Sequence, residues 1–142
     1  MTRWQRVARI VLATFMVAIG LTHFAAPEGF VQIVPKALPA PLVLVYVSGV
    51  FEVLGGIGVL VARTRKLAGW GLIALFVAVF PANINMAVNH IEPVGTHIPE
   101  ALFWLRLPLQ VLLIAWAWWC TRDAAGSGAM PSDSEVKVGA SR

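Results

Sequence analysis

Long apolar runs separated by short polar segments dominate the sequence. Four runs contain about 20 mainly apolar residues each, the length that an α-helix needs to cross the hydrocarbon core of a bilayer. They cover residues 7–25, 41–62, 67–89 and 99–120. Backbone groups in a bilayer core find no water, so a helix is the default structure for such runs. The pattern predicts an all-α fold, a four-transmembrane-helix bundle formed by residues 1–122.

Composition agrees with a membrane location. Apolar residues make up 58% of the 142 residues and charged residues 13%, about half of the usual share in soluble domains. A soluble domain of this length has too little interior to bury so much apolar surface. The first run has a basic start and Ala25 and Ala26 near its end, as cleaved signal peptides do. Pro27 would hinder cleavage there, so we expect this helix to be retained.

Positive charges flank the runs and predict their orientation. Nine of the eleven Lys and Arg residues lie at the start of the chain, between the second and third runs, or after the fourth: Arg3, Arg6, Arg9, Arg63, Arg65, Lys66, Arg122, Lys137 and Arg142. Cytoplasmic loops are enriched in these residues, so both termini are predicted to be cytoplasmic. Cations that bracket apolar runs also argue against a nucleic-acid-binding surface. Residues 123–142 are rich in Gly, Ser and Ala and are predicted to form a disordered cytoplasmic tail.

The segments between and within the runs carry weaker signals. The proline-rich segment 27–40 is predicted to form a short amphipathic turn on the outer membrane surface. Small residues predict where helices touch, and they are Gly49, Gly55, Gly56, Gly58, Ala74, Ala78 and Ala82. Cys120 is the single cysteine, which excludes an internal disulfide and indicates a buried thiol.

Two charged residues, Glu52 and Arg106, lie well inside the predicted spans. A charge near the bilayer centre costs about 2.5–3.5 kcal/mol, so such residues are kept when they are paired, hydrated or functional. With a rise of 1.5 Å per residue, Glu52 lies about 16 Å from the outer end of its helix and Arg106 about 10 Å from the outer end of its own. These depths are similar, and the sequence therefore predicts an intramembrane ion pair between Glu52 and Arg106.

Other polar side chains lie in the outer halves of the runs and predict a buried polar pocket. Its proposed lining is His23, Glu52, Asn83, Asn85, Arg106 and Gln110, with Asn89 and His90 at its mouth. Asn83 and Asn85 converge only if Pro81 distorts its helix, because they point about 200° apart in a straight one. Such groups either join helices or serve a ligand or proton site, and the sequence leaves both open. His23 is predicted to lie at shallow depth, where it is hydrogen-bonded to a neighbouring helix or hydrated.

Other kinds of chemistry find little support in the sequence. There is no phosphate loop or dinucleotide fingerprint, and no Ser or Cys nucleophile stands beside an evident His base. His90, Glu92 and His97 are irregularly spaced, so we expect no metal site. His23 and His90 lie too near the predicted outer edge to favour haem. No catalytic residue is assigned, and whether the protein is an enzyme stays open.

Three motifs are more specific than apolar length: Gly20-Leu-Thr-His23-Phe24, Ser48-Gly49-Val-Phe-Glu52-Val-Leu-Gly55-Gly56 and Phe80-Pro81-Ala82-Asn83. Together they resemble the DoxX-like family of small four-helix membrane proteins, over about residues 7–120. The resemblance implies a multi-pass protein of a bacterial cytoplasmic membrane. It also implies an accessory subunit of a quinone- or sulfur-linked oxidoreductase, with a quinone as the candidate cofactor and oxidoreductase subunits as partners. The oligomeric state stays open.

Two alternative functions follow from the same residues. In the first, the protein is a non-catalytic scaffold or assembly factor, and the polar cluster fixes the helices together. In the second, it is a small transporter or proton pathway. The cytoplasmic halves of the runs are poor in polar groups, which argues against a continuous polar path through a transporter.

Overall fold

The structure of the protein is a computed structural model that describes residues 2–92 and 97–122. Over these residues it contains helices and turns and no strand. The helices are α1 (Arg3–Ala25), α2 (Pro27–Val31), α3 (Pro41–Leu60), α4 (Arg65–Val88) and α5 (Glu100–Thr121). All except α2 are long and apolar enough to cross a membrane, which confirms the predicted all-α architecture with four spans. The predicted tail lies outside the described residues.

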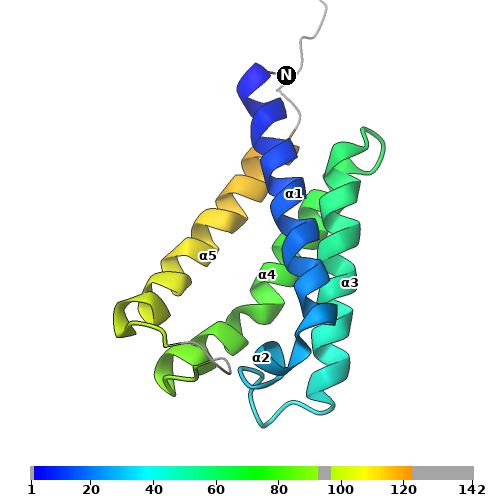
Figure 1. The fold of residues 1–142 in the computed structure, drawn as a ribbon. Helices are drawn as coiled ribbons and strands as arrows, with labels where there is room; N and C mark the ends of the chain where they lie inside the picture. The colour runs from blue at the N-terminus through cyan, green and yellow to red at the C-terminus, as the bar shows by residue number, and fades with distance from the viewer. Residues whose placement is uncertain (1, 93–96, 123–142) are drawn as a thin grey trace, which may run out of the picture.

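The four long helices alternate in direction (Figure 1). The start of α1, the α3–α4 connection and the end of α5 lie at one end of the bundle, and α2 lies at the other. We name the first end the basic end, because it carries Arg3, Arg6, Arg9, Arg63, Arg65, Lys66 and Arg122. Helix α1 packs along α3, α3 along α4 and α4 along α5. Helices α1 and α5 meet near the basic end and diverge toward α2.

Local sequence explains where the helices begin. Helix α1 starts four residues before its predicted start because Thr2 and Gln5 form a capping box. The Thr2 hydroxyl accepts from the Gln5 backbone N–H at 3.2 Å, and the Gln5 side chain accepts from the Thr2 N–H at 3.1 Å. These bonds satisfy donors that a helix start leaves unpaired. Helices α2 and α3 begin with Pro27 and Pro41, at the position where a missing N–H costs nothing.

Glycines allow α1 and α3 to approach closely. A Cβ atom added to Gly20 would lie 2.9 Å from the carbonyl oxygen of Gly49, and one added to Gly49 would lie 3.0 Å from that of Gly20. A Cβ atom at Gly56 would lie 2.9 Å from the carbonyl oxygen of Ala13. Backbone contact at small residues is a main source of helix association in lipid. The predicted helix contacts of Gly49 and Gly56 are confirmed.

The small residues of α3 and α4 divide into two groups. Gly55 and Gly58 face α4, and their added Cβ atoms would meet Leu72 and Ala68. Ala74, Ala78 and Ala82 were also predicted to mark a helix contact, but they do not. Ala74 and Ala78 are exposed, and together with Ala82 they line a cavity described below. The spacing of the alanines predicted a shared helix face, but that face borders open space instead of another backbone.

An apolar core fills the bundle between its middle and the basic end. It consists of Leu12, Ala13, Met16, Val59, Leu72, Phe76, Ala117 and Cys120. The Cys120 side chain is fully buried, as predicted. Beyond the core lies Arg9, which is 4% exposed and donates from Nε and Nη2 to the Cys120 carbonyl oxygen at 3.0 and 2.8 Å. The last carbonyls of a helix lack partners and carry partial negative charge, so this arginine stabilises the end of α5.

Candidate functional site

A cavity of about 770 Å³ lies among α1, α3, α4, α5 and the segment that follows α2. This volume is within the range of small-molecule sites in proteins. Most lining side chains are apolar, including Ile19, Val45 and Phe76. The polar residues of the lining are His23, Ser48, Glu52, Asn83, Arg106 and Gln110. Five of the six residues proposed as pocket lining therefore border one cavity.

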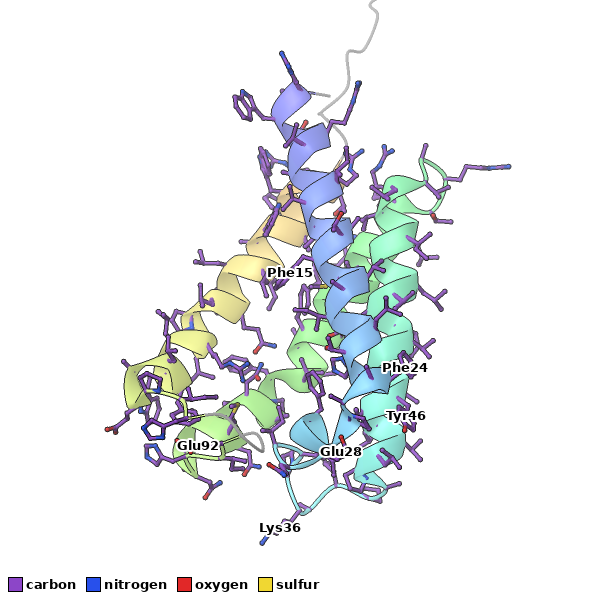
Figure 2. All side chains as sticks on the ribbon, in the orientation of Figure 1. Phe15, Phe24, Glu28, Lys36, Tyr46 and Glu92 are labelled. Atoms are coloured by element: carbon purple, nitrogen blue, oxygen red, sulfur yellow. The ribbon has the colours of Figure 1, made fainter. Side chains whose placement is uncertain are left out.

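The cavity is accessible from the side of the bundle. Phe15 of α1 and Leu109 of α5 line it and are 41% and 46% exposed, and Phe51 of α3 lines it and is 56% exposed. Figure 2 shows Phe15 on the side of α1 that faces α5. These residues lie well inside helices that are long enough to span a bilayer. An opening beside these residues would face the acyl-chain region of a membrane.

His23 and Glu52 form the most buried polar pair of the cavity. His23 Nδ1 lies 3.2 Å from Glu52 Oε2, and each residue is 7% exposed. Nδ1 also lies 2.9 Å from the Ile19 carbonyl oxygen. A carbonyl oxygen only accepts, so Nδ1 carries a proton and donates it to Ile19. The Phe30 ring stacks on the imidazole with centroids 3.8 Å apart.

His23 is buried, so the hydrated alternative for this residue is wrong and its predicted shallow depth is corrected, while its predicted place in the pocket lining is confirmed. That depth was counted from the end of α1. The structure places this end beside the middle of α3, since His23 contacts Glu52, the twelfth residue of that helix. The short helix α2 and the residues after it continue the bundle beyond α1. Phe30 and Ile33 of this segment line the cavity, a role that the predicted turn on the membrane surface did not include.

Glu52 Oε2 has no hydrogen-bond donor among residues 2–92 and 97–122. The nearby His23 Nδ1–H is directed at Ile19 instead. Leaving a buried polar atom unpaired is costly, about 1–3 kcal/mol and more for a charged group. Such atoms are rare in native proteins and require an explanation, of which a ligand is one. Ser48 lies one turn away on the same face of α3 and also lines the cavity.

The predicted ion pair between Glu52 and Arg106 is wrong. The Arg106 guanidinium donates from Nη1 to the thioether of Met86 at 2.6 Å, and no salt bridge joins it to Glu52 in the described part of the chain. The prediction compared depth along the two helices and did not consider lateral position. Helix α3 packs on α1 and α4, whereas α5 packs on α4 and, near the basic end, on α1. The cavity therefore separates two side chains that both line it.

Asn83 and Gln110 link α4 to α5. Asn83 Nδ2 donates to Gln110 Oε1 at 2.5 Å, and Gln110 Nε2 donates to the Phe76 carbonyl oxygen at 2.5 Å. Pro81 has no N–H, so the Val77 carbonyl lacks its helical donor. Gln110 bonds the carbonyl of the residue just before it, Phe76. Gln110 is 4% exposed, and these two hydrogen bonds pair both the oxygen and the nitrogen of its buried amide.

Asn85 does not converge with Asn83, although Pro81 lies between the start of α4 and both residues. Its Nδ2 donates to the Ile33 carbonyl oxygen at 2.9 Å, and its Oδ1 accepts from Asn89 Nδ2 at 2.8 Å. Asn85 thus ties the segment after α2 to α4 and does not belong to the cavity lining. Asn89 and His90, the proposed mouth, are exposed and do not line the cavity either.

The loop histidines do not form a metal centre in the described part of the chain. His97 Nδ1 lies 3.2 Å from Glu92 Oε1, while the His90 ring packs edge-on against Phe103 with centroids 5.7 Å apart. No group of three His, Cys, Asp or Glu side chains comes together among residues 2–92 and 97–122.

Comparison with known proteins places the chain in a family. Residues 12–121 match the domain of unknown function DUF8561. This match covers most of the chain, and the protein belongs to that family. No curated protein and no solved structure matches the chain. The description of that family assigns no activity.

Proposed function

We propose that the protein binds a lipophilic small molecule of the quinone and quinol class in its lateral cavity, as an accessory component of a membrane oxidoreductase system. One observation carries the proposal: the buried Glu52 Oε2 atom lacks a hydrogen-bond donor and borders an apolar cavity that lipid-soluble molecules can reach. An acceptor of this kind matches a ligand hydroxyl group. The apolar walls match the body of a lipid-soluble molecule.

The polar groups of the cavity assign distinct roles. Glu52 accepts a hydrogen bond from a quinol hydroxyl group, which the oxidised quinone lacks, and His23 Nδ1 lies 3.2 Å from the carboxylate. Arg106 donates weakly to a thioether, which is a poor acceptor, so its guanidinium can exchange this contact for a ligand oxygen. The accessory role and the redox partner come from the resemblance to DoxX-like proteins. The quinone and quinol class also comes from that resemblance, because the cavity itself indicates a lipid-soluble molecule with a hydrogen-bond donor.

The scaffold alternative explains some of the polar residues but not Glu52. Asn83, Gln110 and Asn85 make hydrogen bonds between elements, as residues that join membrane helices do. Glu52 Oε2 joins nothing through a hydrogen bond in the described part of the chain. For a transporter, the apolar core between the cavity and Arg9 is an obstacle. These contacts favour a binding site that is closed toward the basic end.

Orientation and location form part of the proposal. The basic end faces the cytoplasm if the Lys and Arg bias acts here as in other membrane proteins. The start of α1 and the end of α5 are then cytoplasmic, and α2 lies on the opposite side of a bacterial cytoplasmic membrane. The lateral opening lies within the bilayer in either orientation.

The test is the identity of lipids that copurify with the protein from its native membrane. Mass spectrometry of the extracted protein should find a quinone or quinol retained through detergent washing. The Glu52→Leu variant should lose it, whereas Glu100→Gln, which removes a carboxylate from the exposed start of α5, should retain it. Absence of such a molecule from the wild-type protein, or equal retention by both variants, would contradict the proposal.

A further inference from the structure

A second, smaller pocket lies at the basic end between the start of α4 and the end of α5. Its volume is about 120 Å³, and its lining consists of Lys66, Trp70, Ile73, Trp118, Thr121 and Arg122. The apolar core separates it from the lateral cavity. It plays no part in the function proposed above.

Two cations border this pocket. The Arg122 guanidinium carbon lies 4.6 Å from the centroid of the Trp118 ring, a cation–π contact that holds the charge beside the pocket. Lys66 is the second residue of α4, where the unpaired N–H groups of the helix start add partial positive charge. No carboxylate is among the described lining residues. The pocket therefore favours an anion.

The described charged residues of the basic end all carry positive charge. Its seven cations have no described carboxylate among them, because Glu28, Glu92 and Glu100 lie near the opposite end and Glu52 lies in mid-span. Clustered charge of one sign raises the local concentration of counter-ions. The pocket is the place where this field meets a cavity of defined shape.

We propose that the pocket binds the headgroup of an anionic phospholipid, with the phosphate between Lys66 and Arg122. Two features favour a lipid over a nucleic acid or an acidic protein segment. Trp70 and Trp118 are 58% and 48% exposed near the ends of spanning helices, where interfacial tryptophans contact headgroups and upper acyl chains. The volume fits a phosphate-sized group. A bound lipid would extend from it along Ile73.

The experiment is a lipid titration of the full-length protein in detergent, followed by native mass spectrometry. Phosphatidylglycerol and phosphatidylcholine are the two probes. The wild-type protein should bind phosphatidylglycerol in preference to phosphatidylcholine. The double variant Lys66→Gln, Arg122→Gln should bind phosphatidylglycerol about 25-fold more weakly, since each cation near an anionic lipid surface contributes about a fivefold factor.

A matched variant separates the pocket from the general field. Arg3→Gln, Arg63→Gln removes two exposed cations from the same end but none from the lining, and its affinity should stay within about threefold of wild type. Equal loss in both double variants would show a diffuse field and overturn the site. Competition by inorganic phosphate or an oligonucleotide as effective as that by phosphatidylglycerol would also overturn it. Unchanged melting of both variants shows that folding is not the cause of any loss.

Discussion

Gly49 lies where α3 touches α1, and its replacement by alanine tests how that contact supports the site. The added Cβ atom would lie 2.8 Å from His23 Cβ, 3.0 Å from the Gly20 carbonyl oxygen and 3.0 Å from Phe24 Cε2. The first two atoms belong to the backbone or are fixed to it, so α1 itself must shift. Inserting a methyl group into a well-packed interface costs about 1–3 kcal/mol.

Gly71→Ala is the matched control for this substitution. A Cβ atom at Gly71 meets nothing within 4 Å, and alanine is the better helix former by about 1 kcal/mol in water. The free energy of unfolding of this variant should therefore stay unchanged or rise slightly. Both substitutions add one methyl group to a glycine in the interior of a spanning helix.

The assay is equilibrium unfolding in mixed micelles with increasing fractions of sodium dodecyl sulfate. Gly49→Ala should lower the free energy of unfolding by about 1–3 kcal/mol. It should also weaken ligand binding at the lateral cavity, because displacement of α1 moves His23 away from Glu52. A Gly49→Ala protein as stable as Gly71→Ala would refute the inferred backbone contact between the helices.

Three further predictions concern the remaining contacts. Arg9→Ala should lower the free energy of unfolding in the same micelle assay by about 1.5–3 kcal/mol, the range for a hydrogen bond to a charged group. An unchanged free energy of unfolding would show that the bonds to Cys120 are not stabilising. A double-mutant cycle of Asn83→Leu and Gln110→Leu should give a coupling energy of about 0.6–1.7 kcal/mol, and additivity would contradict the bond between these amides. Phe30→Ala should speed maleimide labelling of Ser48→Cys in a Cys120→Ala background, because Phe30 covers His23 beside the cavity; an unchanged rate would show that Phe30 does not restrict access.

The sequence predicts the spans well because bilayer thickness sets their length and hydrocarbon sets their composition. The bounds of α3 and α4 differ from the prediction by one or two residues at three of their four ends. The start of α1 differs more because the capping box of Thr2 and Gln5 extends the helix past its apolar run. The contacts of small residues in α3 could be predicted because helices in lipid associate mainly by close packing at such residues.

Pairings between side chains were harder to predict than depths. Counting residues along α3 and α5 locates Glu52 and Arg106 along the bundle axis but says nothing about which helices are neighbours. The carboxylate lies next to His23 from α1, whereas the guanidinium contacts Met86 of α4. Arg9 shows the same difficulty, since it belongs to a flanking basic group in sequence but is buried against the end of α5. Its helical spacing from the buried Leu12 and Met16 was the available signal.

The most direct test of the account is whether Glu52 accepts a hydrogen bond from a ligand in the lateral cavity. Binding of a short-chain quinol and of its dimethyl ether, which lacks hydroxyl donors, can be compared by tryptophan fluorescence in wild type, Glu52→Leu and Glu100→Gln. Wild type and Glu100→Gln should bind the quinol at least about tenfold more tightly than the ether, as expected for a charge-assisted hydrogen bond. Glu52→Leu should bind the quinol and the ether with equal affinity. Equal affinity of the wild-type protein for the two compounds would contradict the account.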